Sequence, residues 1–215
     1  MIAAAGSGQR LGAGGPKAMI EVAGRPMLDW SLEAFGAAET VREIVVAAPP
    51  GEEDAVAKRG VLAVAGGEHR SESVAKALEL CGGEVVVVHD AARPLVTPGL
   101  IDAVVGELAA EEAAAGVIAA APVTDTIKRA DDDARVESTL DRSGLWAVQT
   151  PQAFRAEALR EALSDPAALP DATDDAMLVE SRGGRILIHA SAPENIKVTT
   201  PLDLRLAELL LRERS

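Results

Sequence analysis

The sequence predicts an α/β fold with a mostly parallel, twisted sheet and helices on both of its faces. Two observations support this prediction: short apolar runs alternate with longer amphipathic segments, and the runs are continuously apolar. Continuous apolar runs are typical of strands that are buried on both faces, as in parallel sheets. The repeated order of strand and then helix favours crossover connections that cover both faces of one sheet.

The expected strands and helices follow one another along most of the chain. The strands are expected at residues 1–5, 43–48, 61–65, 84–89, 116–121, 144–149 and 185–189. The helices are expected near residues 25–37, 70–81, 97–113, 155–164, 173–182 and 201–213. Two of these helices have clear start signals, because Thr97-Pro98 and Thr200-Pro201 each place a capping hydroxyl before a proline. Asp203 completes a capping box with Thr200.

Residues 125–142 interrupt the alternation with a highly charged stretch. An acidic turn, Asp131-Asp132-Asp133, lies between two short runs of β-prone residues, which indicates a protruding β-hairpin arm. A two-stranded hairpin is marginally stable in water by itself, so we expect the arm to pack on a second subunit. The alternative is a mobile surface loop. We therefore expect a single domain over residues 1–215, with 125–142 as a dimerisation arm.

The composition limits the classes of function. The hydrophobic fraction is 48%, and no apolar run approaches the ~20 residues of a membrane span. We expect no membrane partner and, without a secretion signal, a cytoplasmic location. The formal net charge of −13 argues against nucleic acid as a partner. The lone Cys81 cannot form an internal disulfide or a cysteine-based zinc site, and is expected to pack on a helix.

A glycine-rich stretch at residues 3–18 follows the first expected strand, where open α/β sheets bind ligands. The spacing of Gly6, Gly8 and Gly12 differs from the dinucleotide-binding pattern, and residues 47–49 lack the acid that would hold a ribose of NAD. A P-loop is also excluded, because no hydroxyl residue follows Lys17. The stretch instead carries two cations, Arg10 and Lys17, which can meet phosphate groups or be solvated.

A second polar set follows the buried run of valines at residues 85–88. His89, Asp90 and Arg93 come where that strand emerges from the sheet. Asp90 can hold a substrate hydroxyl or a water bound to magnesium, and Arg93 can clamp a phosphate. We interpret His89 as a packed or hydrogen-bonded histidine.

Several ordered motifs together resemble one known family. They are AAAGSGQRL with PKA, GGEHRSESV (66–74), HDAARP (89–94), APVTDTIKR (121–129), DRSGLWAVQTPQ (141–152), TDDA (173–176) and NIKVTTPLDL (195–204). The combination closely resembles the 2-C-methyl-D-erythritol 4-phosphate cytidylyltransferases of the non-mevalonate isoprenoid pathway. The resemblance spans nearly the whole chain.

The resemblance implies a homodimeric, Rossmann-like nucleotidyltransferase that makes a CDP-polyol and pyrophosphate from CTP and a polyol phosphate, with Mg²⁺ bound mainly through the triphosphate. It assigns the nucleotide to Ala4, Ala5, Gly6, Ser7, Gly8, Arg10, Lys17, Gly67, Glu68, Arg70 and Ser73. It assigns the polyol phosphate to Asp90, Arg93, Thr126, Arg142, Thr150, Thr173 and Lys197, with Thr126 and Arg142 reaching over from the arm of the partner subunit. No residue is implied as a direct metal ligand.

The implied chemistry needs no general base, because a phosphate monoester has a second pKa of about 6 and is mostly dianionic at neutral pH. Catalysis is then expected from positioning and from four cations: Arg10, Lys17, Arg142 and Lys197. Two alternatives stay open. The first is a cytidylyltransferase acting on ribitol 5-phosphate. The second is a non-catalytic module of the same fold, which the retained loop cations disfavour.

Overall fold

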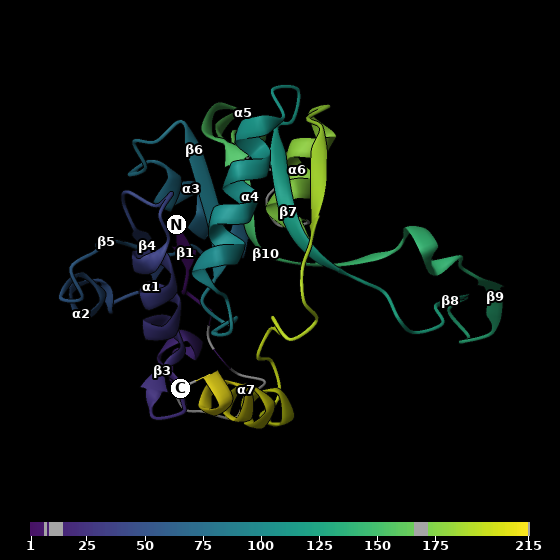
Figure 1. Ribbon diagram of the computed structural model, residues 1–215, viewed down its shortest axis with the longest axis horizontal. Helices are drawn as coiled ribbons and strands as arrows, with labels where there is room; N and C mark the ends of the chain where they lie inside the picture. Colours follow the sequence, from purple (N-terminus) through teal and green to yellow (C-terminus); the bar gives the residue numbers. More distant parts are fainter. Residues whose placement is uncertain (7, 9–14, 166–171, 215) are drawn as a thin grey trace.

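The computed structural model describes residues 1–6, 8, 15–165 and 172–214, and its centre is a seven-stranded sheet (Figure 1). In spatial order the strands are β11 (Ile186–Ala190), β7 (Gly116–Pro122), β10 (Trp146–Arg155), β6 (Val85–Asp90), β1 (Ile2–Ala3), β4 (Val45–Ala48) and β5 (Leu62–Ala65). Within this sheet every strand pair is parallel except those of β10, which runs antiparallel to both β6 and β7. The predicted mostly parallel sheet is confirmed.

Strand β10 differs from the expected strand at 144–149, because it continues to Arg155. The chain returns from the arm before it enters the sheet, so β10 approaches from the end of the sheet at which β7 left it. That return explains its antiparallel direction, and helix α5 (Ala156–Ala162) begins directly after it. The first expected strand is shorter than predicted, since β1 covers only Ile2–Ala3.

Helices cover both faces of the sheet, as predicted. One face packs on α1 (Met27–Ala37) and α4 (Pro98–Ala110), and the other packs on α3 (Arg70–Leu78), α5 and α6 (Asp175–Ser181). Strand β4 illustrates the division, because Val46 and Ala48 belong to the first core whereas Val45 and Ala47 belong to the second. All four side chains are buried. Continuous apolar runs are therefore what this two-sided sheet requires.

A third, smaller core lies beside the sheet. Helix α7 (Pro201–Arg214) packs there against the hairpin of β2 (Glu21–Val22) and β3 (Arg25–Pro26). Neither this hairpin nor the short helix α2 (Glu53–Ala57) was expected from the sequence. Two-residue strands and five-residue helices carry too few residues to show a period.

The predicted helix starts are confirmed by their hydrogen bonds. Thr97 accepts a hydrogen bond from the backbone N–H of Leu100 at 3.3 Å, with Pro98 as the first residue of α4. In the capping box of α7, the N–H of Thr200 donates to Asp203 at 2.8 Å and the N–H of Asp203 donates to Thr200 at 3.2 Å.

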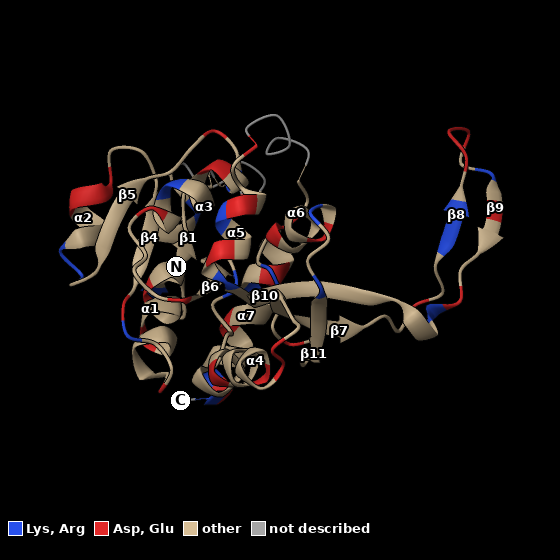
Figure 2. Cartoon of the chain, turned by 90° about the horizontal axis from the view of Figure 1, so that it is seen from above, with Lys and Arg blue, Asp and Glu red and all other residues tan. Residues whose placement is uncertain are grey.

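The charged stretch forms a hairpin that projects from the body of the protein (Figures 1 and 2). Strands β8 (Lys128–Ala130) and β9 (Val136–Thr139) are antiparallel, and every residue in them is exposed. Asp131 closes the turn by accepting hydrogen bonds from the N–H groups of Asp133 and Arg135. The short helix η3 (Arg142–Gly144) then leads into β10. The pairing of β8 with β9 confirms the predicted hairpin, and the role of the arm in dimerisation remains a prediction.

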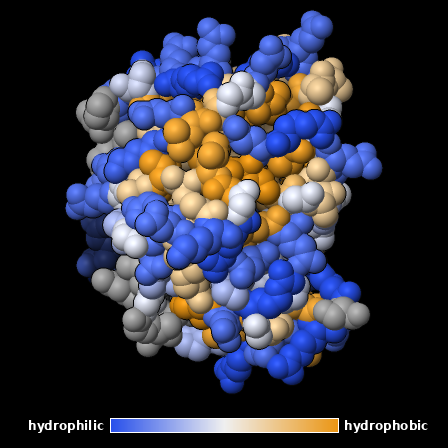
Figure 3. Space-filling view, turned by 90° about the vertical axis from the view of Figure 1, so that its left-hand side faces the viewer, coloured by the Kyte–Doolittle hydropathy of each residue, from blue (hydrophilic) through white to orange (hydrophobic). Residues whose placement is uncertain are grey.

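On the face that carries α2 and the edge strand β5, hydrophobic residues gather in a central patch that is surrounded mainly by polar residues (Figure 3). Leu62 in β5 is 46% exposed. Among the described residues, no helix has the length and apolar character needed to cross a membrane.

Candidate active site

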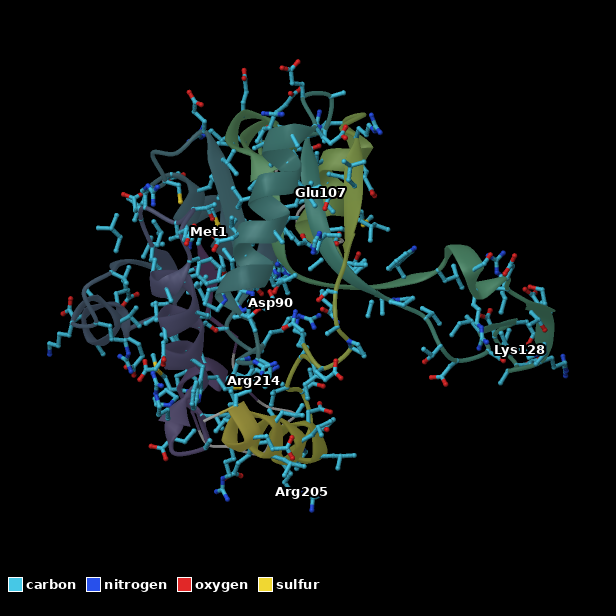
Figure 4. The ribbon with its side chains drawn as sticks, in the orientation of Figure 1. Met1, Asp90, Glu107, Lys128, Arg205 and Arg214 are labelled. Carbon is cyan, nitrogen blue, oxygen red and sulfur yellow. The ribbon has the colours of Figure 1, made fainter. Side chains whose placement is uncertain are left out.

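A cavity of about 610 Å³ lies at the carboxyl ends of β1 and β6. Figure 4 shows Asp90, the last residue of β6, on the side of the sheet that faces α7, whereas Lys128 lies far out on the arm. The cavity is lined by Ala3, Ala4, Ala5, Gly6, Gly8, Lys17, Ala18, Gly67, Glu68, His69, Arg70, Ser73, Asp90, Ala91, Ala92, Lys197 and Thr199. Ligand sites of open α/β sheets occupy this position, outside the carboxyl ends of the strands.

An ion-pair network crosses the floor of the cavity. The Nε atom of Arg70 lies 2.8 Å from one carboxylate oxygen of Asp90, and the Nζ atom of Lys197 lies 2.7 Å from the other. Arg70 also reaches Asp175 in α6, with 2.7 Å between Nη1 and Oδ2. Asp90 therefore orients two cations that come from distant parts of the chain.

The two carboxylates of this network have opposite pKa shifts. Burial alone would raise the pKa of Asp90, but the charges and hydrogen bonds of Arg70 and Lys197 outweigh burial and hold it below its usual range. The side chain of Asp175 is fully buried, and burial raises its pKa despite the attraction of Arg70. Asp90 is thus the firmly charged member of the network.

His89 is a buried structural residue, as the sequence indicated. Its Nδ1 atom lies 2.9 Å from the hydroxyl of Thr150, and its Nε2 atom lies 3.2 Å from the carbonyl oxygen of Arg93. Burial lowers the pKa of His89 to about 3, so the ring is neutral at pH 7. A carbonyl oxygen only accepts, so Nε2 carries the hydrogen and the Thr150 hydroxyl donates to Nδ1. The same hydroxyl accepts from the N–H of Asp90 at 3.1 Å, which fixes the end of β6.

Arg93 lies behind the cavity wall. Its guanidinium donates to the carbonyl oxygen of Asn195 at 2.7 Å and to that of Val148 at 3.2 Å. The amide of Asn195 in turn donates to the carbonyl oxygen of Thr150 at 2.9 Å. Arg93 thus ties the segment that carries Lys197 to strand β10.

Close backbone packing brings the loop at Ala5 against the loop at Gly66. A Cβ atom on Gly66 would lie 2.2 Å from the Cβ of Ala5, so only glycine fits there. The N–H of Lys17 donates to the carbonyl oxygen of Gly6 at 2.9 Å, which holds the lysine at the cavity wall. Gly8 has a φ of +68°, a conformation that favours glycine.

Similarity to known proteins shows the family to which the chain belongs. The family model described as 2-C-methyl-D-erythritol 4-phosphate cytidylyltransferase matches residues 1–213. The chain belongs to that family. A curated relative of that name from Frankia casuarinae is 47% identical over 98% of this chain and 80% of its own length. Another from Rubrobacter xylanophilus is 46% identical over 100% of this chain and 94% of its own length.

Solved structures agree with the family assignment. The 2-C-methyl-D-erythritol 4-phosphate cytidylyltransferase of Thermus thermophilus has a TM-score of 0.79 and 34% identity, over 99% of this chain and 98% of its own. The 4-diphosphocytidyl-2C-methyl-D-erythritol synthase of Anaerococcus prevotii has a TM-score of 0.85 and 28% identity, over 98% and 94%. The chain therefore has the nucleotidyltransferase fold of a family of transferase enzymes, and these names support the predicted methylerythritol substrate over the alternative, ribitol phosphate.

Most of the residues predicted from the family motifs meet in the cavity. Those that line it are Ala4, Ala5, Gly6, Gly8, Lys17, Gly67, Glu68, Arg70, Ser73, Asp90 and Lys197. Ser7 and Arg10 lie outside the described residues. The remaining predicted residues do not line it: Arg93 and Thr150 are buried behind it, Thr126 and Arg142 belong to the arm, and Thr173 is exposed before α6.

The buried partner of Arg70 was not predicted from the sequence. Asp175 lies within the quoted TDDA motif, but charge alone gave no sign that its side chain turns into the core. Asn195 and Gln149, whose amides connect the segment before α7 to β10, were also not predicted. Both lie in quoted motifs, but the apolar residues beside them, Ile196 and Val148, are not fully buried, so no buried pattern marks the two amides.

Proposed function

We propose that this chain transfers the CMP group of CTP to 2-C-methyl-D-erythritol 4-phosphate, giving CDP-methylerythritol and pyrophosphate. The observation that carries the proposal is that three cations, Lys17, Arg70 and Lys197, line one cavity. The chain as a whole is acidic, with a net charge of −13. An acidic protein that binds a triphosphate must gather positive charge locally. The family assignment supplies the identity of the two substrates.

The reaction is an in-line displacement at the α-phosphorus. An oxygen of the substrate phosphate forms a bond to the α-phosphorus while the bond to the bridging oxygen of the β-phosphate breaks, and pyrophosphate leaves with the electron pair. The attacking phosphate is mostly dianionic at neutral pH, since its second pKa is about 6. No proton has to be removed, so the neutral His89 is not needed as a base.

The cations stabilise the charge that accumulates in the transition state. Lys17 comes from the glycine-rich stretch and is assigned to the triphosphate, together with Arg10. Lys197 is assigned to the attacking phosphate, and its side chain is 39% exposed although it is paired with Asp90. Asp90 would direct that ammonium group toward the substrate and can accept a hydrogen bond from a polyol hydroxyl.

Mg²⁺ fits this site as a companion of the triphosphate. The cavity offers two carboxylates, Glu68 and Asp90, and both oxygens of Asp90 already bind cations. Within the described part of the chain, no group of three potential metal ligands is close enough to hold a metal. Triphosphate oxygens and water would therefore supply most of the ligands of Mg²⁺. The bound ion would neutralise part of the negative charge.

A homodimer formed through the arm would complete the site. Thr126 and Arg142 are exposed near the two ends of the arm, and they do not line the cavity of their own chain. Arg142 donates to the carbonyl oxygen of Thr124, which holds it at the base of the arm. A second copy that places these residues at the polyol phosphate would also give the exposed hairpin a surface to pack on. Arg93, Thr150 and Thr173 remain predicted contributors to the same subsite.

The test is pyrophosphate release with CTP and Mg²⁺, with methylerythritol 4-phosphate or ribitol 5-phosphate as acceptor. We expect release with the first acceptor, and Lys17→Ala should lower kcat by roughly 10²- to 10³-fold. Release only with ribitol phosphate would move the protein to the alternative, and Lys17→Ala turnover within about threefold of the parent would refute the role of Lys17. We propose a cytoplasmic location for this reaction.

A further inference from the structure

Three side chains of α3 hold the backbone of the loop at residues 66–69, which separates β5 from α3 and forms one wall of the cavity. The N–H of Gly67 donates to the Ser73 hydroxyl at 2.9 Å. The N–H of Glu68 donates to Glu72 Oε2 at 2.9 Å. The ammonium of Lys76 donates to the carbonyl oxygen of Gly66 at 3.1 Å. Successive peptide groups are thus fixed by one helix.

The spacing of these residues explains how one helix reaches the whole loop. His69 caps α3, and positions three, four and seven residues later lie on one helical face. Glu72 accepts from the N–H of His69 as well, at 3.4 Å, in a capping box. Of the three side chains, Ser73 lines the cavity whereas Glu72 and Lys76 do not. These two residues can act on a ligand only through the loop.

The loop at residues 66–69 is closely packed on both of its sides. A Cβ atom on Gly67 would lie 2.4 Å from the Cβ of Glu72, and one on Gly66 would lie 2.2 Å from the Cβ of Ala5. The loop is therefore held between the helix and the glycine-rich stretch on the other side of the cavity. A small displacement of the loop would therefore disturb its contacts with both α3 and the glycine-rich stretch.

We propose that Glu72 and Lys76 are positioning residues for the nucleotide, which fix the loop at residues 66–69 so that CTP is bound and distinguished from UTP. The inference rests on the proposed function, since it assumes that the loop meets the base. Cytosine carries an amino group at ring position 4, which donates hydrogen bonds, whereas uracil carries a carbonyl oxygen there, which accepts them. The direction of each fixed peptide group therefore affects the choice of base. An unfixed loop could turn to suit either base.

The test compares Glu72→Ala and Lys76→Met with the parent in the same pyrophosphate-release assay. Each variant loses hydrogen bonds to a charged group, so we expect the KM for CTP to rise about 10-fold in each. We expect kcat and the KM for methylerythritol phosphate to stay within about threefold of the parent, and the preference for CTP over UTP to fall. Glu72→Gln and Lys76→Arg keep an acceptor and a donor and should restore most of the affinity.

Matched controls separate positioning from charge and from stability. The side chains of Glu79 and Lys58 make no hydrogen bond or ion pair with any described residue, so Glu79→Ala and Lys58→Met should leave the KM for CTP unchanged. Inhibition by pyrophosphate should also be unchanged in Glu72→Ala and Lys76→Met, because pyrophosphate has no base. If Glu72→Ala fails to fold, the exposed Lys76 carries the test alone.

The outcomes distinguish this inference from the proposed function. A parent that releases no pyrophosphate from CTP would overturn the proposed function itself. An active parent whose Lys76→Met and Glu72→Ala variants keep the parental KM for CTP would overturn the positioning role alone. An equal weakening of CTP and pyrophosphate binding would also overturn it, since that result would indicate an effect of charge on the phosphates.

Discussion

Gly66→Ala tests the close contact between the two walls of the cavity. The added Cβ would lie 2.2 Å from the Cβ of Ala5, whereas carbon atoms in contact need about 3.5 Å. The loop at residues 66–69 and the glycine-rich stretch must then separate by about 1.3 Å. A misplacement of about 1 Å can lower a rate about 10²-fold, so we expect kcat/KM for CTP to fall by about that factor. Steady-state kinetics with both substrates measures it.

Gly106→Ala is the control for this prediction. Gly106 lies within α4, and a Cβ there would meet nothing within 4 Å. Replacement of glycine by alanine inside a helix stabilises it by about 0.5–1 kcal/mol, so this variant should melt slightly higher and keep parental activity. A Gly66→Ala protein whose kcat/KM stays within about threefold of the parent would refute the reasoning, because the two walls would then be free to separate.

Three further predictions follow from burial and charge. His89 has a pKa near 3 in the folded protein against an ordinary value of 6.5, so the unfolded chain binds the extra proton between these values and stability falls as the pH drops through that window, by about 1.4 kcal/mol per unit. Urea unfolding between pH 6 and pH 4.5 should show a shallower loss in His89→Gln, and an unchanged slope would contradict the assignment. Asp175→Asn removes the buried carboxylate beside Arg70 and should cost about 2–3 kcal/mol in urea unfolding; a loss below about 0.5 kcal/mol would mean that the ion pair adds no net stability. Val136, 62% exposed on the arm, should pack at the dimer contact, so Val136→Glu should give monomers in sedimentation velocity, and a persistent dimer would exclude the arm as the contact.

The sequence predicted the main elements because their signals are repeated many times. Continuous valine and alanine runs marked the central strands, and the threonine–proline pairs at residues 97–98 and 200–201 marked the starts of α4 and α7. The direction of β10 was not predictable in the same way, since periodicity shows that a segment is a strand and not which way it enters the sheet. The β2–β3 hairpin was missed because two residues per strand give no pattern.

The site was predicted less completely than the fold. Eleven of the residues predicted from the family motifs line one cavity. The motifs could not distinguish Asp90, whose side chain faces the cavity, from Arg93, whose side chain faces backbone carbonyl groups behind it. The hidden role of Asp175 has the same cause. A charged residue in a motif is visible in the sequence, whereas the direction of its side chain depends on packing between elements far apart in the chain.

Strand β10 connects the arm to the candidate active site. Its first residues leave the body toward the hairpin, its last residues pair with both β6 and β7, and Thr150 between them holds the N–H of Asp90. A single hydrogen bond, from the N–H of Asp90 to Thr150, therefore separates the strand that returns from the arm from the carboxylate that orients Lys197.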